Sequence, residues 1–151
     1  MRKGTTTILI ISVICAGCAG RGTAEIGVKN GRLAPCPDYP NCVSSQTTDR
    51  RHYIESIAYS GSLETARETT RTVIETMKRT KILTIENNYS HAEFTSALFR
   101  FVDDVEFYLA AADKTIHLRS ASRKGYSDLG VNKKRMESIR IKFMALASGK
   151  E

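Results

Sequence analysis

A polar run near the carboxyl end of the chain holds most of the side chains that could bind a ligand or react. Residues 119–132 read RSASRKGYSDLGVN and combine three cations, three serines, one carboxylate and two glycines. Arginine side chains, together with the unpaired N–H groups at the start of a following helix, could hold a phosphate or carboxylate here. The candidate ligand-binding residues of this run are Arg119, Ser120, Ser122, Arg123, Tyr126, Asp128 and Asn132.

The alternative interpretation of this run is a charged connection whose cations are neutralised within the protein. Four more candidate ligand-binding residues precede the run, namely Arg100, Asp103, Asp104 and His117. Arg119 is predicted to lie beside Glu106 on a neighbouring strand, and Arg100 to clamp the turn that holds Asp103. Because charged turns and cross-strand ion pairs are far commoner than binding sites, we expect most of the arginines to be engaged.

A catalytic use of these residues would need a nucleophile, a base and an orienting carboxylate. His117 could act as the base with Asp128 or a nearby serine, which would make the protein a small hydrolase or transferase. The chain lacks a Gly-x-Ser-x-Gly turn and any recognisable oxyanion feature. We therefore favour a non-catalytic protein that binds a ligand or a partner, and we assign no catalytic residue. A purely structural envelope protein is a further alternative.

Neither a metal ion nor an organic cofactor is expected from the residue types. The three histidines are His52, His91 and His117, and no two of them have the spacing of a ligand pair. The formal net charge is +7, yet no run of lysine and arginine with interleaved aromatic residues indicates nucleic acid binding. The basic excess instead suits a surface that faces anionic lipid or polysaccharide.

The first residues of the chain predict export. Residues 1–17 combine Arg2 and Lys3 with a short apolar stretch, 8–14, and with small residues that precede a cysteine. This is the layout of a signal peptide, and the apolar stretch is too short to cross a bilayer, which takes about 20 residues. The letters CAGC resemble a lipobox, so Cys18 is predicted to be acylated, for example with palmitate, and to become the mature amino terminus. Ordinary signal cleavage that leaves Cys18 as a thiol is the alternative.

Acylation would tether the protein to a membrane. Each buried methylene contributes about 0.8 kcal/mol, so two or more acyl chains hold a protein stably. The expected location is the cell envelope, at the periplasmic face of the outer membrane in a Gram-negative cell. Residues 18–33 have no periodic apolar face and are predicted to form a lipidated, flexible tether. The expected partners are this membrane and an anionic small molecule, a lipid, a glycan or another envelope protein.

Two further cysteines predict a disulfide bond. Cys36 and Cys42 remain after signal removal and lipidation, and an exported protein folds in an oxidising compartment. A two-cysteine metal site is the alternative, although no histidine lies near these cysteines in the sequence. The segment between and beside them holds all the prolines of the chain, so we expect a stiff, irregular loop.

The remaining residues, 34–151, have the pattern of a single α+β domain. Strands are predicted over 52–59, 81–86, 91–99, 105–110 and 115–120, helices over 63–79 and 132–147, and hairpin turns over 87–90, 100–104 and 111–114. Val105, Phe107 and Leu109 alternate with polar residues, which predicts one core face and one polar face. Asn132 is expected to cap the second helix. Two helices on one face of an antiparallel sheet form a two-layer structure, and its element order resembles that of TBP-like folds.

Three longer blocks of sequence resemble the domain of unknown function 1499 family. They read PCPDYPNCVSSQ, LFRFVDDVEFYL and IHLRSASRKGYSDLGVNKKRMESIR. They occur in the family's order and extend from about residue 33 to the last helix. The resemblance implies a shared fold and a place in bacterial envelopes or plastids, and it implies no established activity.

Overall fold

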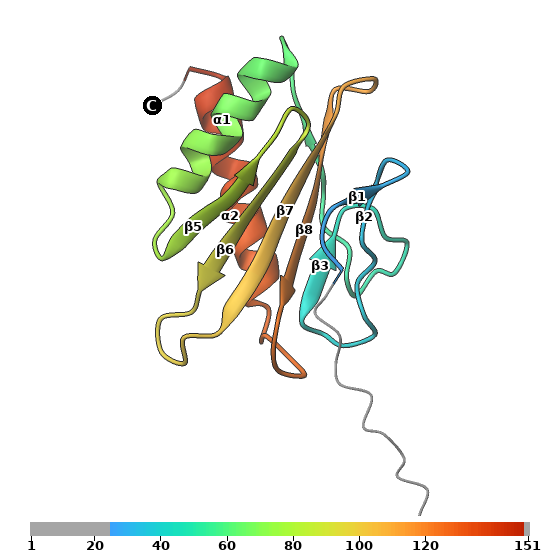
Figure 1. The fold of residues 1–151 in the computed structure, drawn as a ribbon, viewed down its shortest axis with the longest axis vertical. Helices are drawn as coiled ribbons and strands as arrows, with labels where there is room; N and C mark the ends of the chain where they lie inside the picture. Colours follow the sequence, from blue (N-terminus) through green and yellow to red (C-terminus); the bar gives the residue numbers. More distant parts are fainter. Residues whose placement is uncertain (1–24, 150–151) are drawn as a thin grey trace, which may run out of the picture.

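The computed structural model describes residues 25–149, which form one α+β unit (Figure 1). The elements in chain order are β1 (Val28–Lys29), β2 (Arg32–Leu33), β3 (Cys42–Ser44), β4 (Ile57–Ala58), α1 (Leu63–Glu75), β5 (Thr80–Ile85), β6 (Tyr89–Thr95), β7 (Val102–Ala110), β8 (Thr115–Ser122) and α2 (Val131–Ala147). The predicted α+β class is confirmed, and the likeness to TBP-like folds stays a prediction. The predicted signal peptide and the acylation of Cys18 lie outside the described residues. Within these residues no helix is long and apolar enough to cross a membrane.

The main sheet is antiparallel, in the order β3-β8-β7-β6-β5. Strands β5 to β8 follow one another through hairpin turns, as the turn residues predict. β4 pairs with the first residues of β8 and β3 pairs with its last residues, so two short strands share one edge of β8.

The hydrophobic core lies between the sheet and the two helices, which cover the same face (Figure 1). Val105, Phe107 and Leu109 of β7 are fully buried there, which confirms the predicted core face. Ile139 and Phe143 of α2 are buried in the same cluster. This arrangement follows from the alternation of side chains along a strand, because every second residue of β7 is apolar.

On the opposite face, the β7–β8 part of the sheet is covered by residues that we expected to belong to the tether. β1 and β2 form a small hairpin beside the main sheet, and Leu33 of β2 is buried (Figure 1). The backbone N–H of Gly27 donates to Glu106 Oε1 of β7 at 2.7 Å. The prediction of a flexible tether over residues 18–33 is therefore wrong for the part that the structure describes.

Helix α1 begins as predicted and ends earlier. Ser62 Oγ accepts the backbone N–H of Thr65 at 3.0 Å, which satisfies one of the unpaired donors of the first turn. The helix ends at Glu75, and Arg79, expected inside it, has a left-handed backbone with φ 57°. Because a helix cannot continue through that conformation, the chain turns there and enters β5.

The strand predicted over residues 52–59 is reduced to the two residues of β4. Ile54 and Ile57 are both buried, although an odd spacing along a regular strand would place them on opposite faces. The intervening residues are irregular and turn both side chains into the core. The burial of these isoleucines thus overrides the alternating pattern.

The prediction of an acidic turn over residues 100–104 is also wrong. β7 begins at Val102, so Asp103 and Asp104 are strand residues that pair with Ser122 and Ala121 of β8. The turn lies one step earlier, at residues 96–101, where the backbone N–H of Ser96 donates to the carbonyl of Phe101 at 2.8 Å.

Candidate functional site

The loop that carried most of the candidate residues ends at a helix that a carboxylate caps. Asp128 accepts the N–H of Gly130 on Oδ1 at 2.9 Å and the N–H of Asn132 on Oδ2 at 2.7 Å. The negative side chain thereby satisfies two free donors and lies at the positive end of the α2 dipole. The expectation that Asn132 caps this helix is wrong, because Asn132 lies inside the first turn and is fully buried.

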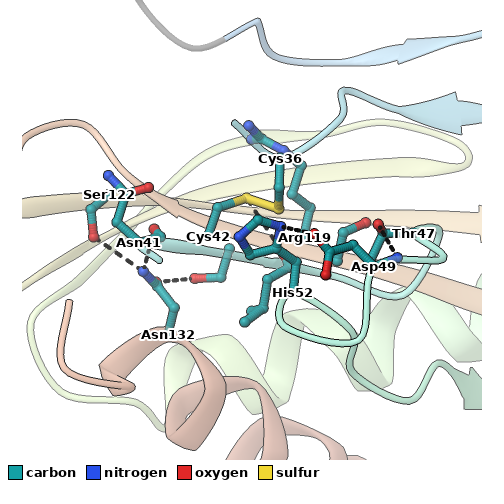
Figure 2. Close-up of a disulfide and its surroundings, with 12 residues drawn as sticks. Cys36, Asn41, Cys42, Thr47, Asp49, His52, Arg119, Ser122 and Asn132 are labelled. Carbon is teal, nitrogen blue, oxygen red and sulfur yellow. Dashed lines mark hydrogen bonds and ion pairs between the residues drawn. A yellow bond between two sulfur atoms is a disulfide. The ribbon is translucent and has the colours of Figure 1, made fainter. Parts of the chain in front are cut away.

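A first polar cluster lies on the helix-facing side of the sheet, around the Asn132 side chain. Asn132 Nδ2 donates to the carbonyl of Asn41 at 3.0 Å and to Ser122 Oγ at 3.1 Å (Figure 2). Its Oδ1 accepts hydrogen bonds from Ser120 Oγ and from the Arg135 guanidinium. The cluster therefore joins the Cys36–Cys42 loop, the end of β8 and the start of α2.

Arg135 connects this cluster to β7. Its Nη2 donates to Asp103 Oδ2 at 2.6 Å, and its guanidinium lies over the Phe94 ring at 4.9 Å from the centroid. Asp103 is buried, so a charged partner is needed to offset the loss of its hydration. The predicted clamp by Arg100 is wrong, because Arg100 is exposed and Arg135 holds Asp103 instead.

A second polar cluster lies on the opposite face of the sheet, around Asp104. Its carboxylate accepts hydrogen bonds from His91 Nε2 at 2.8 Å and from Arg123 Nε and Nη2 at 2.8 and 2.7 Å. Burial alone would raise the pKa of this carboxyl, but the hydrogen bonds of Arg123 and His91 outweigh it and lower the pKa to about 2. The same contact, with Glu93 as a second partner, raises the pKa of the Arg123 guanidinium.

Glu106 and Arg119 extend this second cluster and are almost completely buried. Arg119 Nη1 donates to Glu106 Oε2 at 2.7 Å, which confirms the predicted cross-strand pair. Tyr89 Oη donates to Glu106 Oε1 at 2.8 Å, and burial together with Glu106 raises the pKa of this tyrosine. Arg119 Nε has no hydrogen-bond partner within residues 25–149. The pair is thus a structural element under the N-terminal hairpin.

The predicted disulfide joins Cys36 and Cys42, whose Cα atoms lie 5.6 Å apart. Cys42 belongs to β3 and pairs with Ala121 of β8. Figure 2 shows the disulfide beside Arg119 and His52. The bond therefore fixes the proline-rich loop against the strand that carries the buried arginine.

The histidine considered as a base does not meet the residues expected to assist it. His117 stacks on Tyr108 with 5.9 Å between ring centroids, and its Nδ1 lies 3.5 Å from Ser45 Oγ. Burial lowers the pKa of His117. Ser120 is an odd number of residues away on β8 and faces the helices, while both oxygens of Asp128 bind backbone N–H groups of α2. The catalytic set is therefore not assembled in the described part of the chain.

Several cations near the same end of the sheet have no ion pair among residues 25–149. They are exposed and come from the β6–β7 turn, the β8–α2 loop and the first turn of α2, namely Arg100, Lys124, Lys133 and Lys134. Tyr126 of the same loop packs edge to face on Tyr39, with 5.5 Å between centroids. The positive charge available to a ligand thus belongs largely to residues outside the predicted set.

A pocket that no sequence pattern predicted lies beneath the N-terminal hairpin. Its volume is about 450 Å³, and polar side chains such as Arg32, Ser44 and Gln46 line it. Gln46 Oε1 accepts the N–H of Leu33 at 2.8 Å, so the pocket is held by contacts between the hairpin and the loop after β3. None of the predicted ligand-binding residues lines this pocket. No group of side chains within residues 25–149 is arranged to hold a metal ion.

The chain matches the model of a known protein family. A family described as "Protein of unknown function (DUF1499)" matches residues 32–143. The matched region extends from β2 into α2 and includes both polar clusters and the disulfide. No curated protein matches the chain.

Proposed function

The chain belongs to the DUF1499 family, and we propose that it is an exported, membrane-tethered, non-catalytic protein that binds an anionic ligand or partner at one end of its sheet. The observation that carries this proposal is the division of the cations into two groups. Arg119, Arg123 and Arg135 are held by carboxylates inside the protein. The exposed cations at the same end have no such partners within the described residues.

The group held by buried carboxylates supports a structural role for most of the residues that first indicated a site. A buried ion pair that loses one member leaves an uncompensated charge, so these arginines are poorly suited to exchange their carboxylates for a ligand. Within residues 25–149 no carboxylate forms a hydrogen bond or ion pair with His117, whose contacts are with Ser45 Oγ and the Tyr108 ring. These contacts favour a rigid scaffold over a hydrolase or transferase.

The exposed group supports an anion-binding surface. Lys133 and Lys134 occupy the first turn of α2, where the helix dipole disfavours cations by about 0.3 to 1 kcal/mol each. Asp128 offsets part of this cost through its position at the helix start. An external anion near these lysines would offset the rest, so the surface favours negatively charged groups such as phosphate or sulfate.

The location follows from the sequence of the first 18 residues. A cationic start, an apolar stretch and a lipobox-like CAGC are the features that direct a protein to export and acylation. The Cys36–Cys42 disulfide is consistent with folding outside the cytoplasm. The protein would therefore present its anion-binding surface close to a membrane.

The proposal can be tested by the retention of the purified full-length protein on dextran sulfate resin. A variant with Lys124→Gln, Lys133→Gln and Lys134→Gln should elute at a clearly lower salt concentration than the protein of natural sequence. The reason is that the variant loses exposed cations at this end of the sheet. Mass spectrometry of the same preparation should find fatty acid on Cys18.

The matched control removes three cations that lie elsewhere on the molecule. These are Lys29 of β1, Arg50 of the loop between β3 and β4, and Lys114 of the β7–β8 turn, none of which shares the surface of Lys133 and Lys134. Both triple variants have the same net charge, so a difference in their elution can come only from the position of the cations that were removed. Elution of the two variants at the same salt concentration would reduce the effect to net charge and reject the anion-binding surface.

A further inference from the structure

Large apolar side chains are exposed on two loops at one end of the sheet. Leu98 and Phe99 of the β6–β7 turn are 79% and 68% exposed, and Leu129 of the β8–α2 loop is 87% exposed. Phe101 is also exposed and stacks on Phe99, with 5.6 Å between ring centroids. None of these four residues belongs to the hydrophobic core. We call Leu98, Phe99, Phe101 and Leu129 the apolar tip.

The two loops are neighbours in space although about 30 residues separate them in the chain. The first residues of β7 pair with the last residues of β8, so the turn before β7 and the loop after β8 leave the sheet together. The N–H of Arg123 donates to the carbonyl of Val102 at 3.1 Å, which holds them side by side. Figure 1 shows both loops protruding from the lower end of the molecule, where α2 also begins.

The charge around the apolar tip is positive. Arg100 lies between the two phenylalanines in the sequence, and Lys124 lies in the second loop; both are exposed and have no ion pair within residues 25–149. Asp128, the acid of these two loops, uses both oxygens on backbone N–H groups of α2. The tip therefore combines exposed aromatic and leucine side chains with uncompensated cations.

We propose that the apolar tip inserts into the interface of a bilayer that contains anionic lipid, while Arg100 and Lys124 contact the lipid headgroups. This inference rests on the proposed membrane tether and adds the orientation of the domain on that membrane. Aromatic and leucine side chains lose contact with water in the interface, and arginine and lysine keep their charged ends at headgroup level. Anionic headgroups supply the negative charge that these cations lack in the protein.

The shape of the surface favours a lipid surface over a protein partner. The apolar side chains lie on the ends of two protruding loops, whereas a partner helix or strand would need a groove or an open sheet edge. A fluid interface accepts such side chains without a complementary shape. A second copy of the chain that covers the tip is an outcome that the experiment below distinguishes.

The test uses a single tryptophan as a local reporter, because the natural chain contains none. Full-length protein with Phe99→Trp is reconstituted with vesicles of phosphatidylcholine, with or without phosphatidylglycerol, whose acyl chains are brominated. In the anionic vesicles the emission of this tryptophan should shift to shorter wavelength and be quenched by bromine. Leu129→Trp should behave alike and reports from the second loop.

The matched control is Ala112→Trp, at the exposed turn between β7 and β8. β7 has nine residues, so this turn lies roughly 30 Å from the apolar tip at about 3.4 Å per residue. Its tryptophan should be neither shifted nor quenched. Equal quenching at residues 99 and 112, or none at either, overturns the inference. A shift at residue 99 that depends on protein concentration and not on vesicles assigns the tip to self-association and also overturns it.

The role of the cations is tested in the Phe99→Trp background. In protein that its acyl chains already hold on anionic vesicles, Arg100→Gln with Lys124→Gln should lower the equilibrium constant for insertion of the tip, read from the quenched fraction of the tryptophan, by about fivefold for each cation removed. Equal quenching in vesicles of phosphatidylcholine alone would reject the requirement for anionic lipid.

Two measurements separate this inference from the proposed function. Fatty acid on Cys18 with an unquenched reporter at residue 99 rejects the insertion of the tip and leaves the tether intact. A quenched reporter on a chain without fatty acid rejects the tether and leaves the insertion intact.

Discussion

Three carboxylates of β7 are buried, and each has its own arginine. Asp103 faces the helices and pairs with Arg135, whereas Asp104 faces the other way and pairs with Arg123. Glu106 lies two residues further on the second face and pairs with Arg119. Because side chains alternate along a strand, Asp103 and Asp104 lie on opposite faces and do not repel one another. Asp104 and Glu106 share a face, and an arginine neutralises each of them. These pairs fix the position of β7 relative to the loop after β8 and to α2.

The contacts of Asp104 predict that the stability of the fold falls at acidic pH. The folded-state pKa of about 2 lies below the ordinary value of 3.8, so the carboxylate stabilises the fold above about pH 4 and this contribution is lost as the pH falls toward 2. The shift corresponds to about 2 kcal/mol in the free energy of unfolding. Asp104→Asn should lose about this amount or more at pH 7, because Arg123 then keeps only its half-buried partner Glu93.

Urea unfolding at pH 7 and at pH 3 measures both parts of this prediction. The unmodified protein should lose more stability between these values than the Asp104→Asn variant. Asp113→Asn, in the exposed turn between β7 and β8, is the control and should follow the unmodified protein. If the Asp104→Asn variant retains the full pH dependence, another carboxyl is responsible for it.

At the scale of elements, the β8–α2 connection depends on one side chain for its helix start. Asp128→Ala removes two hydrogen bonds to backbone N–H groups and the negative charge that offsets Lys133 and Lys134. We expect the free energy of unfolding to fall by about 1 kcal/mol, the usual cost of losing an N-terminal cap.

Thermal or urea unfolding measures this loss. Asp38→Ala removes another acid, which is exposed and has no ion pair within residues 25–149, and it should change stability by less than about 0.5 kcal/mol. Equal stability of the two variants would show that the connection is held by the Asn132 contacts and not by Asp128.

Elements with regular apolar patterns could be predicted from the sequence, and those fixed by distant contacts could not. The alternation of Val105, Phe107 and Leu109 identified a core face, and the neighbouring positions of Glu106 and Arg119 indicated their pairing. The bond between Asp103 and Arg135 joins residues 32 positions apart, and no local pattern signals it. Asp104 is likewise stable in a strand because Arg123 reaches it from the loop after β8 and His91 reaches it from β6.

One missed element did have a local signal. Asn30 and Gly31 both have left-handed backbones, with φ 51° and 72°, and connect β1 to β2. Asparagine followed by glycine is the strongest short signal of a tight hairpin, because both residues tolerate positive φ. The flanking strands have only two residues each, so the apolar pattern on which strands are usually recognised is absent. The pocket beneath this hairpin was missed for the same reason.

At the scale of the whole molecule, the sheet is covered on both faces by unlike layers. The helices seal an apolar face, and the N-terminal hairpin with the disulfide loop covers a face that carries buried charges. The second layer is thin and starts at the first described residues. The two loops that carry the apolar tip, and the start of α2 with Lys133 and Lys134, lie at the lower end of the sheet (Figure 1).

The thin layer makes the amino-terminal residues necessary for stability. A chain that begins at residue 34 loses the buried Leu33 side chain and the N–H of Gly27 that binds Glu106, both of which are present in a chain that begins at residue 25. The shorter chain should be less stable by about 2 to 4 kcal/mol, from one buried apolar side chain and one hydrogen bond to a charged group. Urea unfolding of the two chains measures this difference.

Lys29→Ala in the longer chain changes only an exposed side chain of the same hairpin and should have almost no effect. If the two chains are equally stable, the Glu106–Arg119 pair does not need the hairpin. The hairpin then only forms part of the pocket wall and does not stabilise the fold.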